Sequence, residues 1–321
     1  MNTYDLCQMR GKVLKSTGSW YIVRDEANRI VACRLAGHFR TRNIKNTNPI
    51  SVGDWVDFED EAEDKGYIIE LEKRRNYIIR KSVNLSKRAH IIAANLDQSF
   101  LIIALVPPKT QLGFVDRFLA TSEAYAIPTH IIVNKCDLHT DAEQADLEYV
   151  RAVYERAGYS IHIVSTLTGE GIENLKALLK DKTTLVSGNS GVGKSSLINA
   201  LDPDLHLRTK AISKQHLQGQ HTTTFAELFE LSFGAEIIDT PGIKSFGLLD
   251  MEKEEIGDYF PEIFELSKDC KFHNCLHLEE PGCAVVKAYE ENQLAPSRYE
   301  SYRRMLASEE EQGPYRLDEY N

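Results

Sequence analysis

The sequence predicts an α/β protein in three parts, with a parallel-sheet domain between a small N-terminal β-barrel and a C-terminal helical domain. Three observations predict this organisation. Five short apolar or alternating runs, separated by turn residues, fill the first 72 residues. Strand-length apolar runs then alternate with helical stretches through the middle of the chain, which is the pattern of a parallel sheet. The last part is acidic and helical, and it contains a cluster of cysteines and histidines.

Residues 1–72 are expected to form a five-stranded barrel. The predicted strands cover residues 11–15, 20–24, 30–35, 55–58 and 67–71, and polar turn segments divide them. This spacing suits a barrel of the OB type, although it does not by itself exclude an SH3-like barrel. Several aromatic side chains lie near arginines, where they could stack on nucleic-acid bases or belong partly to the core: Trp20, Tyr21, Trp55 and Phe58, with Arg24, Arg34, Arg40 and Arg42.

Residues 73–88 form a basic connector, because they include seven lysines and arginines and no acid. Such a run either binds phosphate groups or is a solvated linker. Residues 89–248 then read as the parallel-sheet domain. Its predicted strands are 100–106, 130–133, 161–164, 184–186, 228–231 and 236–238, and its predicted helices are 116–125, 142–157, 172–179 and one from 196 onward.

Residues 249–321 are predicted to form a helical domain followed by a tail. Residues 296–307 suit an amphipathic helix, and residues 308–321 are polar.

Composition narrows the function classes. The chain has 321 residues, a net charge of −10 and 42% hydrophobic residues, as in ordinary globular proteins. The negative charge argues against a surface coated with nucleic acid, but local basic patches remain possible. No apolar run approaches the roughly 20 residues of a membrane span. The N-terminal residues resemble no secretory signal, so we expect a cytoplasmic protein without a membrane partner.

A phosphate-binding loop is the most specific motif. It matches G-x-x-x-x-G-K-[ST], follows the strand 184–187 and opens a helix, which is the required context. Its glycines let consecutive N–H groups face phosphates at a helix N-terminus. Lys194 is expected to reach the β- and γ-phosphates and Ser195 to bind Mg²⁺. The predicted nucleotide contacts are Gly188, Asn189, Ser190, Gly191, Val192, Gly193, Lys194, Ser195 and Ser196.

A second motif, N-K-x-D, indicates guanine. Guanine presents N1–H and an amino group side by side, and a carboxylate can accept from both. Adenine offers no such pair and would leave a buried carboxylate unpaired. Asp137 suits this role, with Asn134 and Lys135 holding the loop and Cys136 within it. Ser165 and Thr166 follow the next strand and resemble the second base-contacting loop of GTPases.

A third motif, D-T-P-G, follows the strand 236–238. Asp239 would hold Mg²⁺ through water, and the Gly242 N–H would meet the γ-phosphate. In ordinary GTPases the phosphate loop precedes N-K-x-D, whereas here it follows it. The motifs are therefore circularly permuted, and the segment after Gly242 leads directly into the C-terminal domain. We expect nucleotide-dependent ordering of that segment to act on this domain.

Residues 212–225 occupy the position of switch I. One of Thr222, Thr223 and Thr224 is expected to complete the Mg²⁺ shell, and the sequence does not say which. No glutamine follows D-T-P-G to orient water as in Ras-type enzymes. His221 is therefore the candidate catalytic residue, although an exposed loop histidine is the alternative. Slow turnover is expected without an activator.

The C-terminal cluster has the spacing of a zinc site. Cys270, Cys275, His277 and Cys283 provide three thiolates and an imidazole, which suit one tetrahedral Zn²⁺. Four protein ligands leave no open position, so the zinc would be structural. His273 could compete with His277 as the fourth ligand.

Together, the N-terminal barrel, N-K-C-D, G-N-S-G-V-G-K-S-S, H-T-T-T, D-T-P-G and the Cys/His spacing resemble the RsgA (YjeQ-type) family. These are bacterial GTPases of small-ribosomal-subunit biogenesis, and the resemblance covers the chain to about residue 307. It departs at Gln220, where the family commonly has arginine. The implied fold is a circularly permuted P-loop GTPase domain flanked by an N-terminal OB-type β-barrel and a C-terminal helical zinc-binding domain.

The resemblance also implies a function. Such a protein hydrolyses GTP slowly alone and faster with the small (30S) subunit, acts late in subunit maturation, and leaves after hydrolysis to GDP. Its barrel and zinc domain contact 16S rRNA, and the histidine that corresponds to His221 is catalytic. We expect a monomer. The competing interpretation is an RNA-bound scaffold with little turnover. A kinase is disfavoured by N-K-x-D and D-T-P-G.

Overall fold

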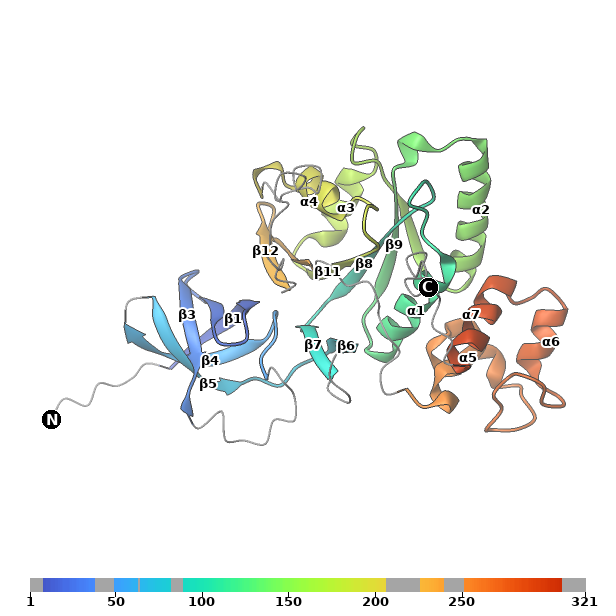
Figure 1. The fold of residues 1–321 in the computed structure, drawn as a ribbon, viewed down its shortest axis with the longest axis horizontal. Coiled ribbons are helices and arrows are strands. Elements are labelled where there is room, and N and C mark those ends of the chain that lie inside the picture. The colour runs from blue at the N-terminus through green and yellow to red at the C-terminus, as the bar shows by residue number, and fades with distance from the viewer. Residues whose placement is uncertain are drawn as a thin grey trace, which may run out of the picture.

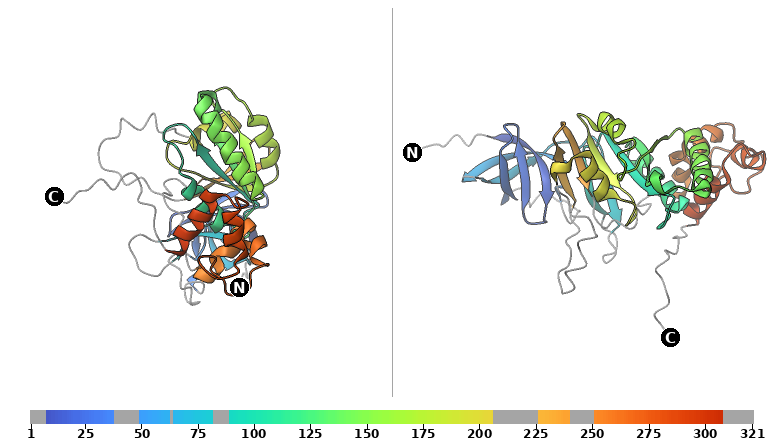
Figure 2. Two further views of the ribbon diagram at one scale, coloured as in Figure 1. Left: turned by 90° about the vertical axis from the view of Figure 1, so that its right-hand side faces the viewer. Right: turned by 90° about the horizontal axis from the view of Figure 1, so that it is seen from above.

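The computed structural model describes residues 8–37, 49–62, 64–81, 89–205, 226–239 and 251–307. Three parts follow one another along the longest axis, with the barrel at one end and the C-terminal helices at the other (Figures 1 and 2). Within the described residues, no helix is both long and apolar enough to cross a membrane.

The N-terminal part is a closed five-stranded barrel. Its strands are β1 (Met9–Ser16), β2 (Tyr21–Asp25), β3 (Ile30–Leu35), β4 (Trp55–Ala62) and β5 (Lys65–Leu71). They pair in the order β1-β2-β3-β5-β4, and β4 pairs again with β1. Only β3 and β5 run parallel among these pairs. Closure through β1 and β4, with β3 beside β5, confirms the OB-type barrel that the spacing had left open.

The barrel core consists of alternate residues of the five strands, as period-2 patterning requires. Tyr21 and Phe58 are its largest members, and both are fully buried. Tyr21 and Phe58 therefore belong to the core. Trp20 and Trp55 are half-buried and lie under arginine side chains.

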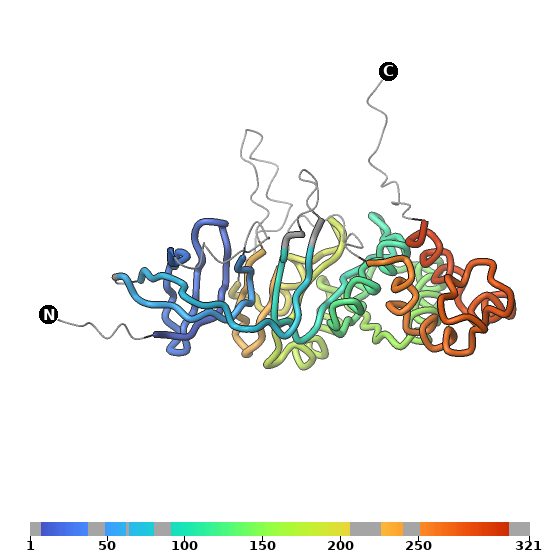
Figure 3. Tube along the Cα trace, turned by 90° about the horizontal axis from the view of Figure 1, so that it is seen from below, coloured from blue at the N-terminus to red at the C-terminus, as the bar shows by residue number. Residues whose placement is uncertain are grey.

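The basic segment contains a strand. β6 (Tyr77–Lys81) pairs antiparallel with β7 (Ala89–Ala94) in a separate two-stranded sheet. Ile78, the second residue of β6, is fully buried in the main core. Figure 3 shows this hairpin, in cyan, between the barrel at one end of the molecule and the C-terminal helices at the other.

The central domain is a mostly parallel sheet with helices on both faces. Its strands are β8 (Gln98–Ala104), β9 (Thr129–Asn134), β10 (Ser160–Ile163), β11 (Thr183–Ser187), β12 (Glu227–Leu231) and β13 (Ala235–Asp239). The order is β10-β9-β8-β11-β13-β12, and within it β12 alone is antiparallel to its neighbour. The predicted alternation of strands and helices is confirmed.

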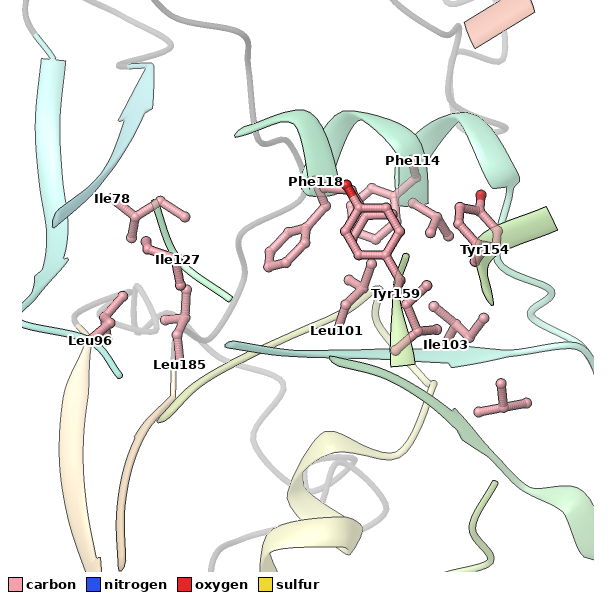
Figure 4. Packing of buried hydrophobic residues seen from close by; sticks show 14 of the residues in the cluster. Ile78, Leu96, Leu101, Ile103, Phe114, Phe118, Ile127, Tyr154, Tyr159 and Leu185 are labelled. Carbon is pink, nitrogen blue, oxygen red and sulfur yellow. The ribbon is translucent and has the colours of Figure 1, made fainter. Parts of the chain in front are cut away.

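Helices α1 (Leu112–Ala124) and α2 (Asp141–Arg156) cover one face of this sheet, and α3 (Ile172–Leu179) and α4 (Lys194–Leu201) cover the other. Alternate residues of β8 separate the two cores. Leu101 and Ile103 pack toward α1 with Phe114 and Phe118 (Figure 4), whereas Phe100 and Ile102 pack toward α3 and α4. The sheet is therefore buried on both sides, as its continuous apolar runs predicted.

The C-terminal domain packs against α1. It comprises a 3₁₀ segment (Lys253–Tyr259) and helices α5 (Pro261–Ser267), α6 (Ala284–Glu290) and α7 (Pro296–Leu306). Its core includes Phe260, Tyr299 and Tyr302, and it extends to Ala120 of α1. The sheet domain thus has a separate module on each side (Figure 1).

Candidate nucleotide site and metal centre

The predicted nucleotide motifs meet at one edge of the central sheet. Parallel strands end at the same edge, and ligands of open α/β sheets bind there. Register places Val133 beside both Ile103 and Ile163, and Val186 beside Asp239. Asn134, Ser165, Gly188 and Asp239 all stand at these carboxyl ends. The fold therefore brings together motifs that are up to 105 residues apart in sequence.

The phosphate loop has the backbone that its glycines predicted. Gly188, Gly191 and Gly193 have φ values of 148°, 88° and 101°. A Cβ on Gly188 would lie 2.2 Å from the Ile102 carbonyl oxygen. Side chains are thus excluded both by conformation and by close packing against β8.

Lys194 begins α4 and folds back over the loop. Its Nζ donates to the carbonyl oxygens of Gly188 at 2.5 Å and Asn189 at 2.9 Å. The ammonium charge is thereby held inside the loop, at a helix N-terminus that adds partial positive charge. Ser195 and Ser196 follow it in the first turn of α4 and are half-buried. This arrangement can bind phosphate groups.

Asn134 connects the base-reading segment to the phosphate loop. Its side chain is fully buried, and its amide donates to the Val192 carbonyl oxygen at 2.8 Å. A Cβ on Gly193 would lie 2.3 Å from that amide nitrogen. The contact requires the end of β9 and the phosphate loop to keep one relative position. Asn134 was predicted to hold its own loop, and the bond observed in the structure runs from its amide to the phosphate loop.

Asp137 is positioned by Ser165. The Ser165 hydroxyl donates to Asp137 Oδ1 at 2.5 Å and accepts the N–H groups of Leu167 and Thr168 at 3.2 and 3.1 Å. Ser165 is fully buried, whereas Asp137 is exposed. The turn that includes Thr166 therefore orients a solvent-facing carboxylate. Lys135 before it adopts a left-handed conformation with φ 69°.

The Cys136 thiol lies beside a carboxylate. Its Sγ donates to Glu170 Oε2 at 3.4 Å, and burial together with this carboxylate raises the pKa of Cys136 to about 11. A thiol with so high a pKa remains protonated at neutral pH. Glu170 was missed by motif reasoning, as was Pro108, whose Cγ would lie 3.0 Å from a Cβ on Gly191. No local sequence signal identifies either residue.

Asp239 ends β13 beside β11, at the edge where the phosphate loop begins. Asp239 is the last residue of the described range 226–239, so the structure places it. The predicted contacts at His221, Thr222, Thr223, Thr224 and Gly242 lie outside the described residues.

The four predicted metal ligands converge in the C-terminal domain. Their ligand atoms, from Cys270, Cys275, His277 and Cys283, all lie within 4.8 Å of one another. Cys270 Sγ is 3.8 Å from Cys283 Sγ, and these atoms are 3.5 and 3.4 Å from His277 Nδ1. A tetrahedron with Zn–S bonds of about 2.3 Å and a Zn–N bond of about 2.0 Å has edges of roughly 3.8 and 3.5 Å. The site is therefore compatible with one tetrahedral metal ion.

Hydrogen bonds from α7 hold the loop that contains His277. His277 has φ 55°, and its carbonyl oxygen accepts the Tyr299 hydroxyl at 2.7 Å. The Tyr302 hydroxyl donates to the Leu276 carbonyl oxygen at 2.8 Å. Both tyrosines belong to α7, so the helix supports the ligand loop in the manner of an outer shell. His273, the alternative ligand, is exposed and outside this group.

Comparisons with known proteins agree with this geometry. The family model described as RsgA GTPase matches residues 71–249, and the RsgA N-terminal domain model matches residues 10–68. The protein called "Small ribosomal subunit biogenesis GTPase RsgA" in Christiangramia forsetii is 53% identical to this chain, over 97% of this chain and 99% of that protein. The protein of the same name in Bacteroides fragilis is 51% identical, over 96% of this chain and 99% of that protein.

Solved structures agree as well. The crystal structure of YjeQ from Thermotoga maritima has a TM-score of 0.75 and 32% identity, over 94% of this chain and 98% of that one. The structure of YloQ, described as a circularly permuted GTPase, has a TM-score of 0.72 and 32% identity, over 96% and 97%.

The fold and site define a P-loop GTPase with circularly permuted motifs. The chain belongs to the RsgA GTPase family, as its sequence motifs had indicated.

Proposed function

We propose that this GTPase acts in late maturation of the small ribosomal subunit. It binds the 30S subunit and its 16S rRNA in the GTP state and leaves after hydrolysis to GDP and phosphate. The observation that carries the nucleotide part is the direct bond from Asn134 to the phosphate loop, beside a carboxylate aimed by Ser165. The names of the relatives support the ribosomal part.

Magnesium accompanies the nucleotide in this proposal. Ser195 and Asp239 stand at the same sheet edge and would hold the ion, with one of Thr222, Thr223 and Thr224 completing the shell. Bound Mg²⁺ would neutralise phosphate charge. The protein's own part is to place Lys194 and the loop N–H groups around the phosphates and to hold guanine through Asp137. Gly242 would contribute its N–H to the γ-phosphate.

His221 is the proposed water-positioning residue. No glutamine follows Asp239-Thr-Pro-Gly, so another side chain must do this work. A His221→Ala variant is expected to keep its affinity for GTP while losing turnover. Full turnover with unchanged affinity would refute the role.

One structural Zn²⁺ is proposed for the C-terminal domain. The donor set of three thiolates and an imidazole is closed, and its spacing fits the tetrahedron given above. Purified protein should contain close to one equivalent of zinc, and less than half an equivalent would count against the site.

The barrel is the proposed RNA-contacting surface. Arg34 stacks on Trp20 at 4.0 Å from the ring centroid, and Arg10 stacks on Trp55 at 4.1 Å. Arginine side chains placed over indole rings suit phosphates and unstacked bases. The same proposal places the protein in the cytoplasm as a monomer.

The deciding experiment measures GTP turnover with and without 30S subunits, and co-sedimentation with these subunits in GDP or a non-hydrolysable GTP analogue. We expect slow turnover alone, stimulation by subunits, and tighter binding with the analogue. A scaffold would co-sediment equally with both nucleotides and would show no stimulation.

A further inference from the structure

The barrel is joined to the GTPase sheet by strand pairing and by buried charge. β1 pairs with β12, with Lys15 opposite Glu227, so one continuous sheet of eleven strands runs through both parts. Behind this pairing, cations of β1 and β2 meet acids of β12 and β13. Figure 1 shows β1 beside β12 at this junction.

Lys12 is the centre of the buried part. It is 5% exposed, and its Nζ donates to Thr183 Oγ1 at 2.8 Å and pairs with Glu236 Oε2. Thr183 Oγ1 donates to the same Glu236 oxygen at 2.6 Å, and Arg24 donates to the other oxygen at 2.5 Å. Each charge therefore has a partner of opposite sign. Removing Glu236 would take away the carboxylate that the buried Lys12 ammonium contacts, which is strongly unfavourable, whereas removing Lys12 would leave Glu236 paired with Arg24.

The two strands that Lys12 contacts are those that lead into the nucleotide site. Thr183 begins β11, which ends at the phosphate loop. Glu236 lies in β13, which ends at Asp239, three residues later. A single barrel side chain thus bridges the strand of the phosphate loop and the strand of the D-T-P-G motif.

A second connection lies closer to the site. Lys15 is opposite Glu227, Glu227 is opposite Asp239, and Asp239 is opposite Val186. These four residues form one row across four strands. The Lys15 Nζ and Glu227 Oε2 atoms are 3.1 Å apart, in a half-exposed pair. The barrel is therefore in register with the edge at which the nucleotide motifs stand.

We infer that Lys12 is a positioning residue that couples the barrel to the nucleotide site. A movement of the barrel relative to the sheet would shift β11 and β13 through the Lys12 ammonium group, because it contacts one side chain of each strand. This inference rests on the proposed stimulation of turnover by the small subunit. Coupling of this kind is reciprocal: if the bound nucleotide changes the affinity of the barrel for a ligand, that ligand changes the affinity for the nucleotide by the same factor.

The enzymatic test compares Lys12→Met and Lys12→Arg with the wild type. Lys12→Met should keep basal turnover and lose most of the stimulation by 30S subunits. It should also lose the tighter binding of subunits in the GTP-analogue state, which a typical coupling free energy makes about 5–150-fold. Lys12→Arg keeps the charge and should restore much of it. Stimulation of Lys12→Met equal to that of the wild type would overturn the inference. An equal loss of basal and stimulated turnover would do the same.

A spectroscopic test needs no ribosome. The chain has two tryptophans, Trp20 and Trp55, and both lie in the barrel. Lys12 Nζ lies 5.7 Å from the Trp55 ring centroid. In a Trp20→Phe background, Trp55 emission should differ between the GDP and GTP-analogue states. Lys12→Met should abolish that difference.

Arg10→Met is the matched control for this measurement. Arg10 also stacks on Trp55, but its ion pairs, with Glu26 and Glu72, stay within the barrel. This variant should change Trp55 emission in both states and keep the difference between them. Loss of the difference in Arg10→Met, or its persistence in Lys12→Met, contradicts the inference.

If Lys12→Met does not fold, Thr183→Val tests the bridge to β11 with a side chain of nearly the same shape, and it should reduce both stimulation and the fluorescence difference. If the wild type is not stimulated by subunits, the proposed function fails, and the Trp55 measurement still decides the inference.

Discussion

Arg298 of α7 joins the C-terminal domain to α1 of the GTPase domain, and its replacement is expected to destabilise this interface. The side chain is 1% exposed. Its Nη1 donates to Asp116 Oδ1 of α1 at 2.9 Å, and its Nε and Nη2 donate to the two Glu262 oxygens at 2.6 and 3.0 Å. The guanidinium also lies 4.5 Å from the Phe260 ring centroid. Asp116 is fully buried, and burial raises the pKa of its carboxyl group even though Arg298 opposes the shift.

Arg298→Met removes the cation and leaves a carboxylate inside the interface. Breaking a buried pair in this way costs about 3–5 kcal/mol. Asp116→Asn removes the opposite charge, and its amide can still accept the Tyr154 hydroxyl, which is 2.8 Å from Asp116 Oδ1. In the double variant no unpaired charge remains at position 116. Its loss should therefore be smaller than the sum of the single losses, by about 0.5–3 kcal/mol.

The assay is a double-mutant cycle on the full chain with its metal bound. Free energies of unfolding in urea give the cycle, and amide hydrogen exchange in α1 and α7 shows whether the interface itself opens. Exchange in the barrel strands should not change. A loss below about 1 kcal/mol in Arg298→Met, which is within the ordinary range for single substitutions, or additive single losses, would refute this account of the interface.

Two further predictions concern the sites, and a third concerns His130 of β9. Asp137→Asn should weaken GTP binding by about 1.5–3 kcal/mol. It should also improve binding of xanthosine triphosphate, whose ring has a carbonyl at the position of the guanine amino group. Calorimetry measures both affinities, and an unchanged affinity for GTP would exclude Asp137 as the residue that recognises the base. Cys283→Ala should lower the zinc content and increase hydrogen exchange in α6 and α7 while the barrel strands stay protected; full protection of both helices would contradict a structural role for the metal. Burial lowers the pKa of His130 to about 4, below its unfolded value of about 6.5, so the native state binds fewer protons between these values. The free energy of unfolding should fall as pH decreases from 6.5 toward 4, and His130→Gln should flatten that slope; an identical slope in the variant would show that His130 is not responsible.

Local elements followed from the sequence where apolar patterning was clear. The predicted helix 142–157 and the observed α2 (Asp141–Arg156) agree within one residue, and a capping box between Thr140 and Glu143 explains its start. α1 begins four residues before the predicted helix 116–125, because buried Phe114 and Val115 extend its apolar face. β6 lies within residues 73–88, for which the basic residues led us to predict a connector and no strand, although the segment contains a short apolar run with Ile78.

Both candidate sites could be proposed from the sequence because their motifs are local. A phosphate loop, N-K-x-D and a Cys/His cluster each encode their chemistry in a few neighbouring residues, and the order of these motifs already indicated the permutation. Glu170 and Pro108 beside the nucleotide motifs were not predictable in this way, since each belongs to no pattern and reaches the site through the fold.

The sequence by itself thus determined which motifs this protein has, which ligands they suit and in what order they occur, and it predicted which residues would contact those ligands. The tertiary structure alone decided the closure of the barrel, the contact of Lys12 with Thr183 and Glu236, and the burial of Arg298 against Asp116. These pairs are separated by 171, 224 and 182 residues along the chain. Such contacts depend on the path of the whole chain and on strand register, and no local pattern of residue types contains that information.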